Sequence, residues 1–362
     1  MPDERDIDPV HIGDRAVGPG EPAYVIAEAG ANHDGELAKA KRLVDAAVES
    51  GADAVKFQNY TAERLVTRDA PKYWDEGTQY ETFTELDVLE REDYEAMAAY
   101  ARHQDLMYLS TPFDGLAVDL LDDLDVPAYK IASGDLTHHP LLRDVASRGE
   151  PVILSTGMAT LEEIRAAVGV IEDAGNDDIV LLHCITRYPT DIGDANLRMM
   201  STLMREFDHP VGLSDHTIGT TVPVAAAAMG AAVIEKHFTY DTSLEKSPDH
   251  RLSADVEVMS EIVDRTREVH AAMGRAEQGP TEVEADGMRL ARRSLVTDRA
   301  IEAGERIRRT DLAVKRPGTG LAPKLLFEVD EGEWRATRDL DADTVLTATD
   351  VEGLPTGAAD DD

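Results

Sequence analysis

Eight short apolar runs alternate with amphipathic segments between Tyr24 and Gly274, and this alternation constrains the fold more than any other feature of the sequence. The runs span residues 24–30, 54–58, 106–112, 128–135, 152–157, 179–184, 211–216 and 233–238. Most have the length and the Val, Ile and Leu content of a buried strand. A strand–helix unit repeated eight times predicts an α/β fold, a closed parallel (β/α)8 or TIM barrel over residues 23–274.

Helical periodicity fills the intervals between the runs, most plainly over residues 36–50, 91–104, 160–175 and 254–274. Gly51, Gly175 and Gly230 stand where helix C-caps are expected. An open doubly wound sheet is the alternative α/β fold. Its dinucleotide-binding form would carry GxGxxG after the first strand, whereas this chain has EAGANHDG over residues 28–35, so we favour the closed barrel.

The segments that flank the barrel have a different composition. Residues 1–22 indicate a hairpin that leads into the first strand across the barrel floor. After Gly274 we expect a linker over 275–290, a second unit of short strands and turns over 291–354, and a disordered tail over 355–362. Inside the barrel, the long aromatic segment 59–90 is either a lid over the functional face or a packed surface excursion.

The charge balance excludes several classes of function. With 36 Lys and Arg against 72 Asp and Glu, the formal net charge is −36, which repels nucleic acid and acidic membranes. The acids are spread along the chain, which favours a halophilic protein over a generally acidic mesophilic one. The sequence shows no signal peptide and no membrane-spanning stretch, so we expect a cytoplasmic enzyme. The lone Cys184 excludes a disulfide framework.

Polar side chains gather where the predicted strands end, which is where barrels of this type carry their catalytic residues. They are Glu28, Lys56, Gln58, Thr111, Lys130, Ser133, Asp135, Ser155, Asp215, His216, Glu235, Lys236 and His237. These residues form three groups with different chemistry.

Two histidines, His216 and His237, end the seventh and eighth strands. Imidazoles at adjacent strand ends can face one centre. With carboxylates and water beside them they suit a borderline divalent ion such as Mn²⁺. Two histidines that are hydrogen-bonded in the core are the alternative. We favour the metal site because both residues occupy matching positions.

A second group is cationic and rich in hydroxyls: Lys56, Thr111, Lys130, Ser133 and Ser155. Buried ammonium groups need compensating anions. Together with the backbone amides of Gly134 and Gly157, this group can hold a phosphate and a carboxylate. Alternatively, the lysines pair only with Glu28 and Asp135, or one of them forms a Schiff base.

The third group is acidic and consists of Glu28, Asp215 and Glu235. These carboxylates could support a metal, position a water molecule or move protons. They would serve equally well as counter-ions of the lysines. Spacing alone does not separate a base from a counter-ion.

Several motifs resemble those of the N-acetylneuraminate (sialic acid) synthase family, in the family's order, over about residues 11–353. They are IAEAGANHDGELAKAKRLVDAAVESGADAVKFQ, STPFD, YKIASGD, ILSTGM, LLHCITRYPT, GLSDHTIG, EKHFT and KRPGTG. In that family a small antifreeze-like SAF domain, a β-clip fold, follows the barrel, and RRSLVTDRAIEAGERIRRTDLAVKRPG resembles its start. The resemblance implies condensation of phosphoenolpyruvate with an N-acylmannosamine-type sugar, giving a nine-carbon 2-keto-3-deoxy acid and phosphate.

The resemblance also implies roles for individual residues. His216 and His237 would bind Mn²⁺ or a similar ion such as Mg²⁺ or Co²⁺, and Glu28 and Asp249 would hold the sugar. Arg316 would be delivered by the SAF domain of a partner subunit in a domain-swapped homodimer. The phosphoenolpyruvate contacts would be Lys56, Thr111, Lys130, Ser133, Ser155 and Tyr188. From the residues themselves we expect the catalytic group to comprise Glu28 or Glu235, as the carboxylate that orients and deprotonates water, with Lys130 and Asp215.

The chain departs from the family pattern mainly on the sugar side. Asp135 stands where SGE is usual, and Thr186, also expected to contact substrate, replaces a common asparagine. The motif PGPDH becomes KSPDH over residues 246–250, and Leu290 replaces an aromatic residue of some members. The reaction type is therefore firmer than the sugar, and precursors of legionaminic or pseudaminic acid are alternatives.

Other functions fit the sequence less well. A 3-deoxy-heptulosonate or octulosonate synthase would share the barrel and phosphoenolpyruvate, but EAGANHDG and the C-terminal KRPG favour the sialic type. A non-catalytic carbohydrate- or ice-binding protein would leave the lysines and histidines without a purpose. A lyase running the reverse reaction is disfavoured by the phosphate-holding group.

Overall fold

The computed structural model describes residues 7–72, 75–86, 88–274, 278–330 and 332–355. The chain divides into two compact units, Met1–Gly274 and Arg275–Asp362. Several predicted features lie outside the described residues: positions 1–6 of the N-terminal extension, Tyr73 and Trp74 of the long segment, 275–277 of the linker, and 356–362 of the tail.

Eight parallel strands form the sheet of the first unit, in the order β5-β4-β3-β10-β9-β8-β7-β6. Their bounds are β3 (Tyr24–Gly30), β4 (Ala54–Asn59), β5 (Met107–Pro112), β6 (Tyr129–Ile131), β7 (Val152–Ser155), β8 (Ile179–Cys184), β9 (Val211–Asp215) and β10 (Val233–His237). In the described residues, β5 and β6 contact each other without a hydrogen-bonded ladder, so the ring is nearly closed. The predicted (β/α)8 barrel is confirmed.

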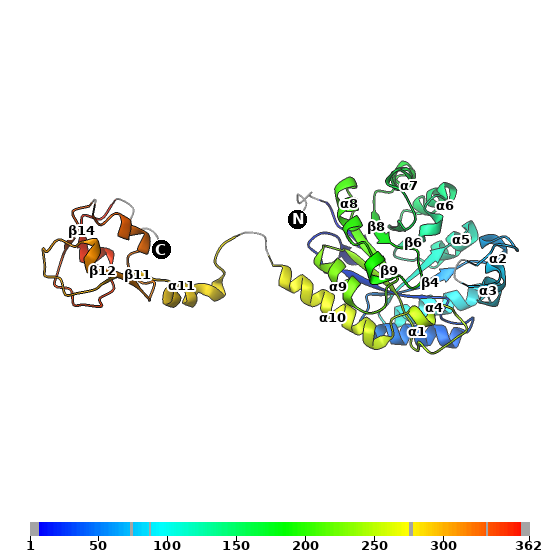
Figure 1. The fold of residues 1–362 in the computed structure, drawn as a ribbon. Helices are drawn as coiled ribbons and strands as arrows, with labels where there is room; N and C mark the ends of the chain where they lie inside the picture. The colour runs from blue at the N-terminus through cyan, green and yellow to red at the C-terminus, as the bar shows by residue number, and fades with distance from the viewer. Residues whose placement is uncertain (1–6, 73–74, 87, 275–277, 331, 356–362) are drawn as a thin grey trace. The chain divides into compact units, whose positions relative to one another are not determined.

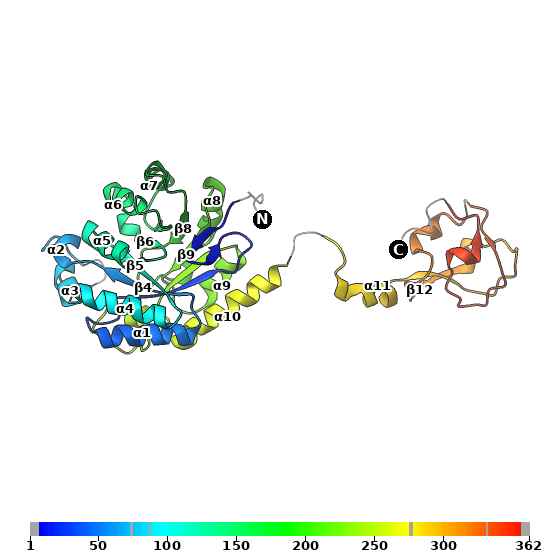
Figure 2. The same ribbon diagram turned by 180° about the vertical axis from the view of Figure 1, so that it is seen from behind.

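Helices surround the strands on the outside (Figure 1 and Figure 2). They are α1 (Leu37–Ser50), α4 (Arg91–His103), α5 (Gly115–Asp123), α6 (His139–Ala146), α7 (Leu161–Asp173), α8 (Arg198–Glu206), α9 (Thr221–Ala228) and α10 (Val256–Met273). Gly51, Gly175 and Gly230 have φ of 75°, 90° and 93° after α1, α7 and α9, so each ends its helix as predicted. Within the described residues, no helix combines the length and apolarity needed to cross a bilayer.

The strands carry apolar side chains on both faces, because alternate residues point in opposite directions. Outward residues such as Val55, Leu213 and Ile234 join the main core with the helices. Inward residues form a second cluster with the N-terminal hairpin, β1 (Val10–Ile12) and β2 (Arg15–Val17). The inward cluster includes Val10, Ile12, Val17, Tyr24, Ile26, Ala54, Leu109, Ala128, Ile153, Val180, Leu182 and Val233. The described hairpin thus packs against the amino-terminal part of the barrel interior.

The fourth barrel strand is shorter than its apolar run suggested. The run covers residues 128–135, but β6 ends at Ile131 and a 3-10 turn follows over Ser133–Asp135. The Ser133 hydroxyl accepts a hydrogen bond of 3.0 Å from the Gly157 backbone N–H. This bond ties the turn to the segment after β7, so the chain bends across the barrel end where the sequence had suggested a longer strand.

The long segment 59–90 contains α2 (Ala62–Leu65) and α3 (Gln79–Leu86). Tyr60 is 6% exposed, and its ring packs edge-on against Phe83 and Phe113 at centroid distances of 5.2 and 5.8 Å. These contacts fasten the described part of the segment to the barrel. The lid role stays a prediction.

The second unit has its own core, which contains Leu295, Ile307 and the fully buried Trp334. Its strands pair as two antiparallel ribbons, β11 (Ser294–Thr297) with β12 (Leu312–Lys315) and β13 (Arg335–Ala336) with β14 (Val351–Glu352). The sequence suggested a linker over 275–290, but α11 (Ala285–Ala291) makes the end of that segment helical.

Candidate active site at the carboxyl end of the barrel

A polar layer lies directly above the apolar floor of the barrel. Because alternate residues of a strand face the interior, the residue two positions after each floor residue also points inward. In this way Ile26 is followed by Glu28, Ala54 by Lys56, and Val233 by Glu235. The layer comprises Glu28, Lys56, Thr111, Lys130, Ser155 and Glu235, each no more than 4% exposed.

The centre of this layer is an ion cluster of two lysines and two glutamates. Lys56 Nζ pairs with Glu28 and lies 3.7 Å from Glu235 Oε2, and it donates a hydrogen bond of 3.0 Å to Thr111 Oγ1. Lys130 Nζ lies 3.4 Å from Glu235 Oε1. Both lysines predicted to face the site therefore do so, and each has a carboxylate partner.

Burial and charge shift the pKa values of the cluster in different directions. Burial would raise the pKa of Glu235, but Lys130, Lys56 and a hydrogen bond from Ser214 Oγ outweigh it and hold the pKa at about 2. Burial raises the pKa of Glu28 even though Lys56 opposes the shift. Burial also lowers the pKa of Lys130. Glu235 is thus ionised near neutral pH, whereas Glu28 is the more basic carboxylate.

Hydroxyl groups without partners lie beside the lysines. Ser155 Oγ and Thr186 Oγ1 are buried and have no hydrogen-bond partner among the described residues. A Cβ atom added to Gly157 would lie 2.5 Å from Thr186 Oγ1 and 2.8 Å from Ser133 Oγ, so only glycine fits between these side chains. Buried hydroxyls need partners, and together with the lysines they form a cradle suited to an anion.

The two predicted metal-binding histidines face each other at the ends of β9 and β10. The ring centroids of His216 and His237 lie 5.4 Å apart, and the Tyr188 ring packs against His216 at 4.1 Å and against His237 at 5.8 Å. His216 Nδ1 lies 2.7 Å from the Ile185 carbonyl oxygen, which fixes Nδ1 as the protonated nitrogen and leaves Nε2 as an acceptor.

Of the two histidines, His237 has a buried ring nitrogen without a hydrogen-bond partner in the described part of the chain. Its Nδ1 is buried without a hydrogen bond in the described structure and lies 3.8 Å from Asp249 Oδ2. Burial and the neighbouring His216 hold the pKa of His237 well below its usual value, so the ring is neutral. A neutral, buried imidazole with a free nitrogen is the form that binds a metal ion.

The pair fits a divalent ion only with help from other ligands. Within the described residues, no group of three or more His, Cys, Asp or Glu side chains is arranged to hold a metal. His216 and His237 would supply two nitrogens, and water or substrate oxygens would supply the rest, which suits an open site with borderline chemistry.

Asp215 lies apart from this group, although it was predicted to belong to the catalytic residues. Its carboxylate accepts hydrogen bonds of 2.6 Å from Lys236 Nζ and of 3.0 Å from both the N–H and the hydroxyl of Thr217. Strand alternation puts Asp215 and Lys236 on the outward face, opposite to His216 and Glu235. Asp215 is the counter-ion of Lys236 and shapes the turn that carries His216.

Other predicted residues are distributed around the site. Asp249 lies on the connection between β10 and α10, and burial raises its pKa to about 6. Burial also raises the pKa of Asp135 to about 6. Arg316 is an exposed residue of the second unit.

Two interior residues were missed by the sequence reasoning. Ser214 donates its hydroxyl hydrogen bond to Glu235, and Cys184 Sγ lies 3.8 Å from His216 Nδ1. Both occupy the same inward parity on their strands as His216 and Leu182, so alternation was the signal that could have identified them.

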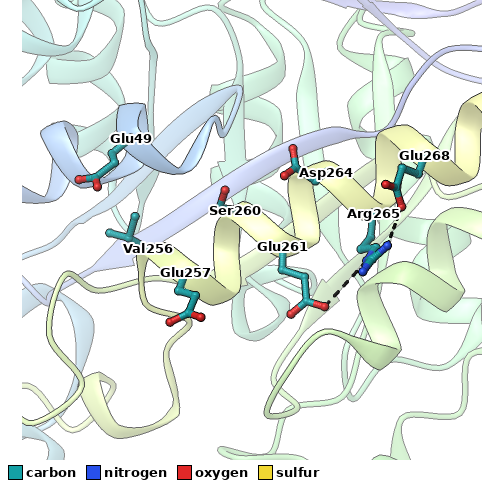
Figure 3. A pocket seen from close by; sticks show the side chains of 8 residues that line it. All are labelled: Glu49, Val256, Glu257, Ser260, Glu261, Asp264, Arg265 and Glu268. Carbon is teal, nitrogen blue, oxygen red and sulfur yellow. Dashed lines mark hydrogen bonds and ion pairs between the residues drawn. The ribbon is translucent and has the colours of Figure 1, made fainter.

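A surface hollow beside α1 and α10 is distant from this chemistry. It is lined by Glu49, Val256, Glu257, Ser260, Glu261, Asp264, Arg265 and Glu268 (Figure 3). Arg265 is paired with Glu261 and Glu268 there. The residues that line the hollow belong to the outer helices or their ends, and none of them belongs to the polar layer.

Comparisons with known proteins identify the family of the chain. Residues 43–278 match the NeuB family and residues 292–352 match the SAF domain. An uncharacterised protein of Methanocaldococcus jannaschii is 47% identical over 88% of this chain and 91% of its own length. The N,N'-diacetyllegionaminic acid synthase of Legionella pneumophila is 41% identical over 91% of this chain and 94% of its own.

A solved structure shares the fold. The N-acetylneuraminic acid synthetase of Leptospira borgpetersenii aligns with 78% of this chain and 95% of its own, with a TM-score of 0.72 and 30% identity.

Proposed function

Since the chain belongs to the NeuB family, we propose that it joins phosphoenolpyruvate to the aldehyde carbon of an open-chain N-acyl amino sugar. The products are a nine-carbon 2-keto-3-deoxy acid and inorganic phosphate. The chain is an enzyme, a transferase of the N-acetylneuraminate synthase type, like its named relatives.

The observation that carries this proposal is the pair of buried ammonium groups on Lys56 and Lys130, set beside the unpartnered hydroxyls of Ser155 and Thr186. Phosphoenolpyruvate carries a phosphate and a carboxylate a few bonds apart. Two cations and several hydroxyl donors in a water-poor interior suit such an anion. Thr111 and Ser133 lie in hydrogen-bond contact with Lys56 and Gly157, so they belong to the same cradle.

The reaction balances as follows. C3 of phosphoenolpyruvate forms a bond to the aldehyde carbon, and the aldehyde oxygen takes up a proton. C2 becomes electron-poor, and water adds to it with loss of a proton. The bond between C2 and the phosphate oxygen then breaks, phosphate leaves, and the C2 hydroxyl loses its proton to give the ketone. Cleavage is therefore of the C–O bond.

Glu28 is the better proton acceptor for the water. Its pKa is raised by burial, and Lys56 lies against it. With a pKa of about 2, Glu235 is too weak a base for this step. Glu235 instead holds Lys56 and Lys130 charged and in place for the anionic substrate. Lys130 would then stabilise the negative charge of the leaving phosphate.

His216 and His237 are proposed to hold a divalent cation, Mn²⁺ first, with Mg²⁺ or Co²⁺ as alternatives. When bound, such an ion supplies Lewis-acid polarisation of the sugar aldehyde. Ile185 orients His216 through its carbonyl, and the Tyr188 ring packs against both imidazoles. These contacts fix the two rings before substrate arrives.

The acceptor sugar is proposed to contact Asp249 and Glu28. Asp249 lies on the connection that follows β10, with its Oδ2 3.8 Å from His237 Nδ1. An N-acylmannosamine-type sugar fits the family resemblance. The 41% identity to a diacetyllegionaminic acid synthase supports the legionaminic precursor as the first alternative, with the pseudaminic precursor as the next.

We also propose a homodimer in which Arg316 of a partner copy completes the site. Arg316 is exposed, as a residue that acts in a second copy must be. Met158, Ile192 and Ile218 are exposed apolar residues on the connections that follow β7, β8 and β9, at the mouth of the barrel. Their exposure supports a mouth that a second copy covers.

One experiment tests the proposed function. The protein is incubated with phosphoenolpyruvate, Mn²⁺ and concentrated KCl, and released phosphate is measured with a panel of aldehydes. The panel contains N-acetylmannosamine, the six-carbon precursors of legionaminic and pseudaminic acids, erythrose 4-phosphate and arabinose 5-phosphate. Turnover with an amino sugar supports the proposal. Turnover only with a sugar phosphate would assign the chain to the heptulosonate or octulosonate type instead.

A further inference from the structure

The loop between β3 and α1 buries three polar side chains for which the reaction has no use. Asn32, His33 and Asp34 are 0%, 3% and 1% exposed. Asp34 also has a φ of 53°, in the left-handed region that costs energy for any residue but glycine. A buried carboxylate in such a conformation needs strong compensating contacts.

Among the described residues, the contacts of the Asp34 carboxylate and carbonyl with side chains and loop backbone lead, apart from one to Lys39, to a segment far away in the sequence, the connection between β10 and α10. Asp34 Oδ1 accepts a hydrogen bond of 3.1 Å from the Ser247 N–H and lies 3.2 Å from His250 Nε2. The Asp34 carbonyl oxygen accepts a hydrogen bond of 2.6 Å from Lys246 Nζ. The remaining partner is Lys39 of α1, whose Nζ lies 2.9 Å from Asp34 Oδ2.

Asn32 fastens the other end of the same segment. Its Nδ2 donates to the Phe238 carbonyl oxygen at 2.9 Å and to Ser253 Oγ at 3.1 Å. The Ser253 hydroxyl in turn donates a hydrogen bond of 2.7 Å to the backbone oxygen of Asp249. We call these bonds of Asn32 and Asp34 to residues 238–253 the loop clamp.

The clamp contains a chain of Asp34, His250 and Thr239 that has the order of a catalytic triad. His250 Nδ1 lies 2.7 Å from Thr239 Oγ1. Thr239 and His250 are both 0% exposed and Asp34 is 1% exposed, so no substrate reaches the hydroxyl. These three residues therefore cannot act as a nucleophile with its base, and their role is to hold the backbone.

Asp249 is the residue that the clamp encloses. It stands between Ser247 and His250, which both bond to Asp34, and its own carbonyl bonds to Ser253. Its carboxylate faces His237 at 3.8 Å. The other hydrogen bonds of Asp249 are local, from the Leu252 and Ser253 N–H groups to its carbonyl oxygen and from its own N–H to Ser247 Oγ, so the clamp is what ties this part of the connection to the β3–α1 loop.

We infer that Asp34 is a positioning residue, which fixes Asp249 for the acceptor sugar from the neighbouring β3–α1 loop. The inference rests on the proposed function, because Asp249 is a sugar contact only if an amino sugar is the acceptor. Asp34 touches neither substrate, so its loss should weaken sugar binding and leave the phosphoenolpyruvate cradle intact.

The test compares Asp34→Asn with Asp53→Asn. Asp53 is a matched control, because it is also a buried carboxylate that accepts a backbone hydrogen bond, 2.8 Å from the Val25 N–H, and pairs with a cation, Arg15. We expect Asp34→Asn to raise KM for the amino sugar about tenfold, with KM for phosphoenolpyruvate changed less than about twofold. Asp53→Asn should change neither KM by more than about twofold.

A second readout does not depend on turnover. Hydrogen exchange of the amides in residues 238–253 should become at least about tenfold faster in Asp34→Asn and stay unchanged in Asp53→Asn. If Asp34→Asn does not fold, Ser253→Ala replaces it, since it removes only the bridge from Asn32 to the Asp249 carbonyl. Ser253→Ala should raise the KM for the amino sugar and speed hydrogen exchange in residues 238–253, each by a smaller factor than Asp34→Asn.

The outcomes separate the two ideas. Unchanged exchange in residues 238–253 overturns the clamp whether or not the enzyme turns over. Faster exchange with an unchanged sugar KM, or an equal rise in both KM values, overturns the positioning of the sugar. If the unmodified protein releases no phosphate with any aldehyde, the proposed function fails, and hydrogen exchange alone then decides whether the clamp holds the Asp249 segment.

Discussion

The ammonium of Lys130 lies 3.4 Å from a carboxylate oxygen of Glu235, with both groups buried inside the barrel. Burial disfavours the charge of each, and each favours the charge of the other. Removal of one partner therefore leaves an uncompensated buried charge, which is costly. The Lys130–Glu235 pair therefore contributes both to the predicted substrate cradle and to the stability of the barrel.

Substitution Lys130→Met should impair use of phosphoenolpyruvate selectively. We expect kcat/KM for phosphoenolpyruvate to fall at least about a hundredfold, with a much smaller change in KM for the sugar, because the cradle loses one of its two cations. Steady-state phosphate release at varied concentrations of each substrate measures this. Lys236→Met is the control, since it breaks the buried pair with Asp215 on the other strand face. Equal loss in both variants would show that Lys130 acts only through folding.

Substitution His216→Ala should remove the metal and most of kcat. The variant loses one of the two nitrogens proposed to bind the ion, so Mn²⁺ bound after dialysis should fall from about one per chain to near zero. Metal analysis and phosphate release measure the two effects. His209→Ala, which removes a peripheral histidine paired with Glu172, should keep both. Near-full activity of His216→Ala without added metal contradicts the assignment.

Substitution Asp135→Asn should stabilise the fold near neutral pH but not in acid. Burial raises the pKa of Asp135 to about 6, above its unfolded value, so the folded protein binds this proton more tightly. Stability is then lost as pH rises through about 6, where the carboxyl ionises inside the protein. Asparagine avoids that loss, so the free energy of unfolding should rise roughly 1–2 kcal/mol near pH 7.5 after allowance for solvent screening.

The same variant should show no gain near pH 4, because Asp135 is then protonated in the wild type as well. Denaturant unfolding at the two pH values measures the difference. A gain of equal size at both would mean that the carboxyl charge is not the cause.

Salt should stabilise the protein strongly. A net charge of −36 repels itself in the folded state, and salt screens that repulsion. We expect Tm to rise by roughly 5–10 °C between about 0.1 M and about 2 M KCl. Thermal unfolding followed by circular dichroism measures the shift, with NaCl at equal ionic strength as the control. A Tm that stays constant or falls contradicts the halophilic interpretation.

The barrel was predictable because its signal is local. Each strand is a short apolar run with turn residues or a helix pattern after it, and the observed strands fall within or beside those runs. The inward layer was predictable to the same extent, because Lys56, Lys130 and Glu235 are charged residues in otherwise apolar strands. Asp215 was assigned to this layer wrongly. Both faces of its strand are buried, so hydrophobicity did not distinguish the inward face from the outward face that Asp215 occupies.

The loop clamp was not predictable from local pattern. Asp34 and His250 are separated by 216 positions, and neither lies in a periodic segment. The motif of the β3–α1 loop argued against a dinucleotide fingerprint and contributed to the family resemblance, but neither use indicated which residues the loop contacts. Its partners became evident only when the first and last barrel strands were seen side by side, with Tyr24–Glu28 paired to Val233–His237.

The hairpin packs Ile12 and Val17, both fully buried, against the inward side chains of the strands, so in the described residues the amino end of the barrel is filled by side chains. Substrates and products would therefore enter and leave at the carboxyl end of the barrel. On the proposed function, the three-carbon donor sits in the lower layer and the sugar above it, so the donor must be seated first. The bulky keto acid, as the upper occupant, must depart before the phosphate beneath it can follow.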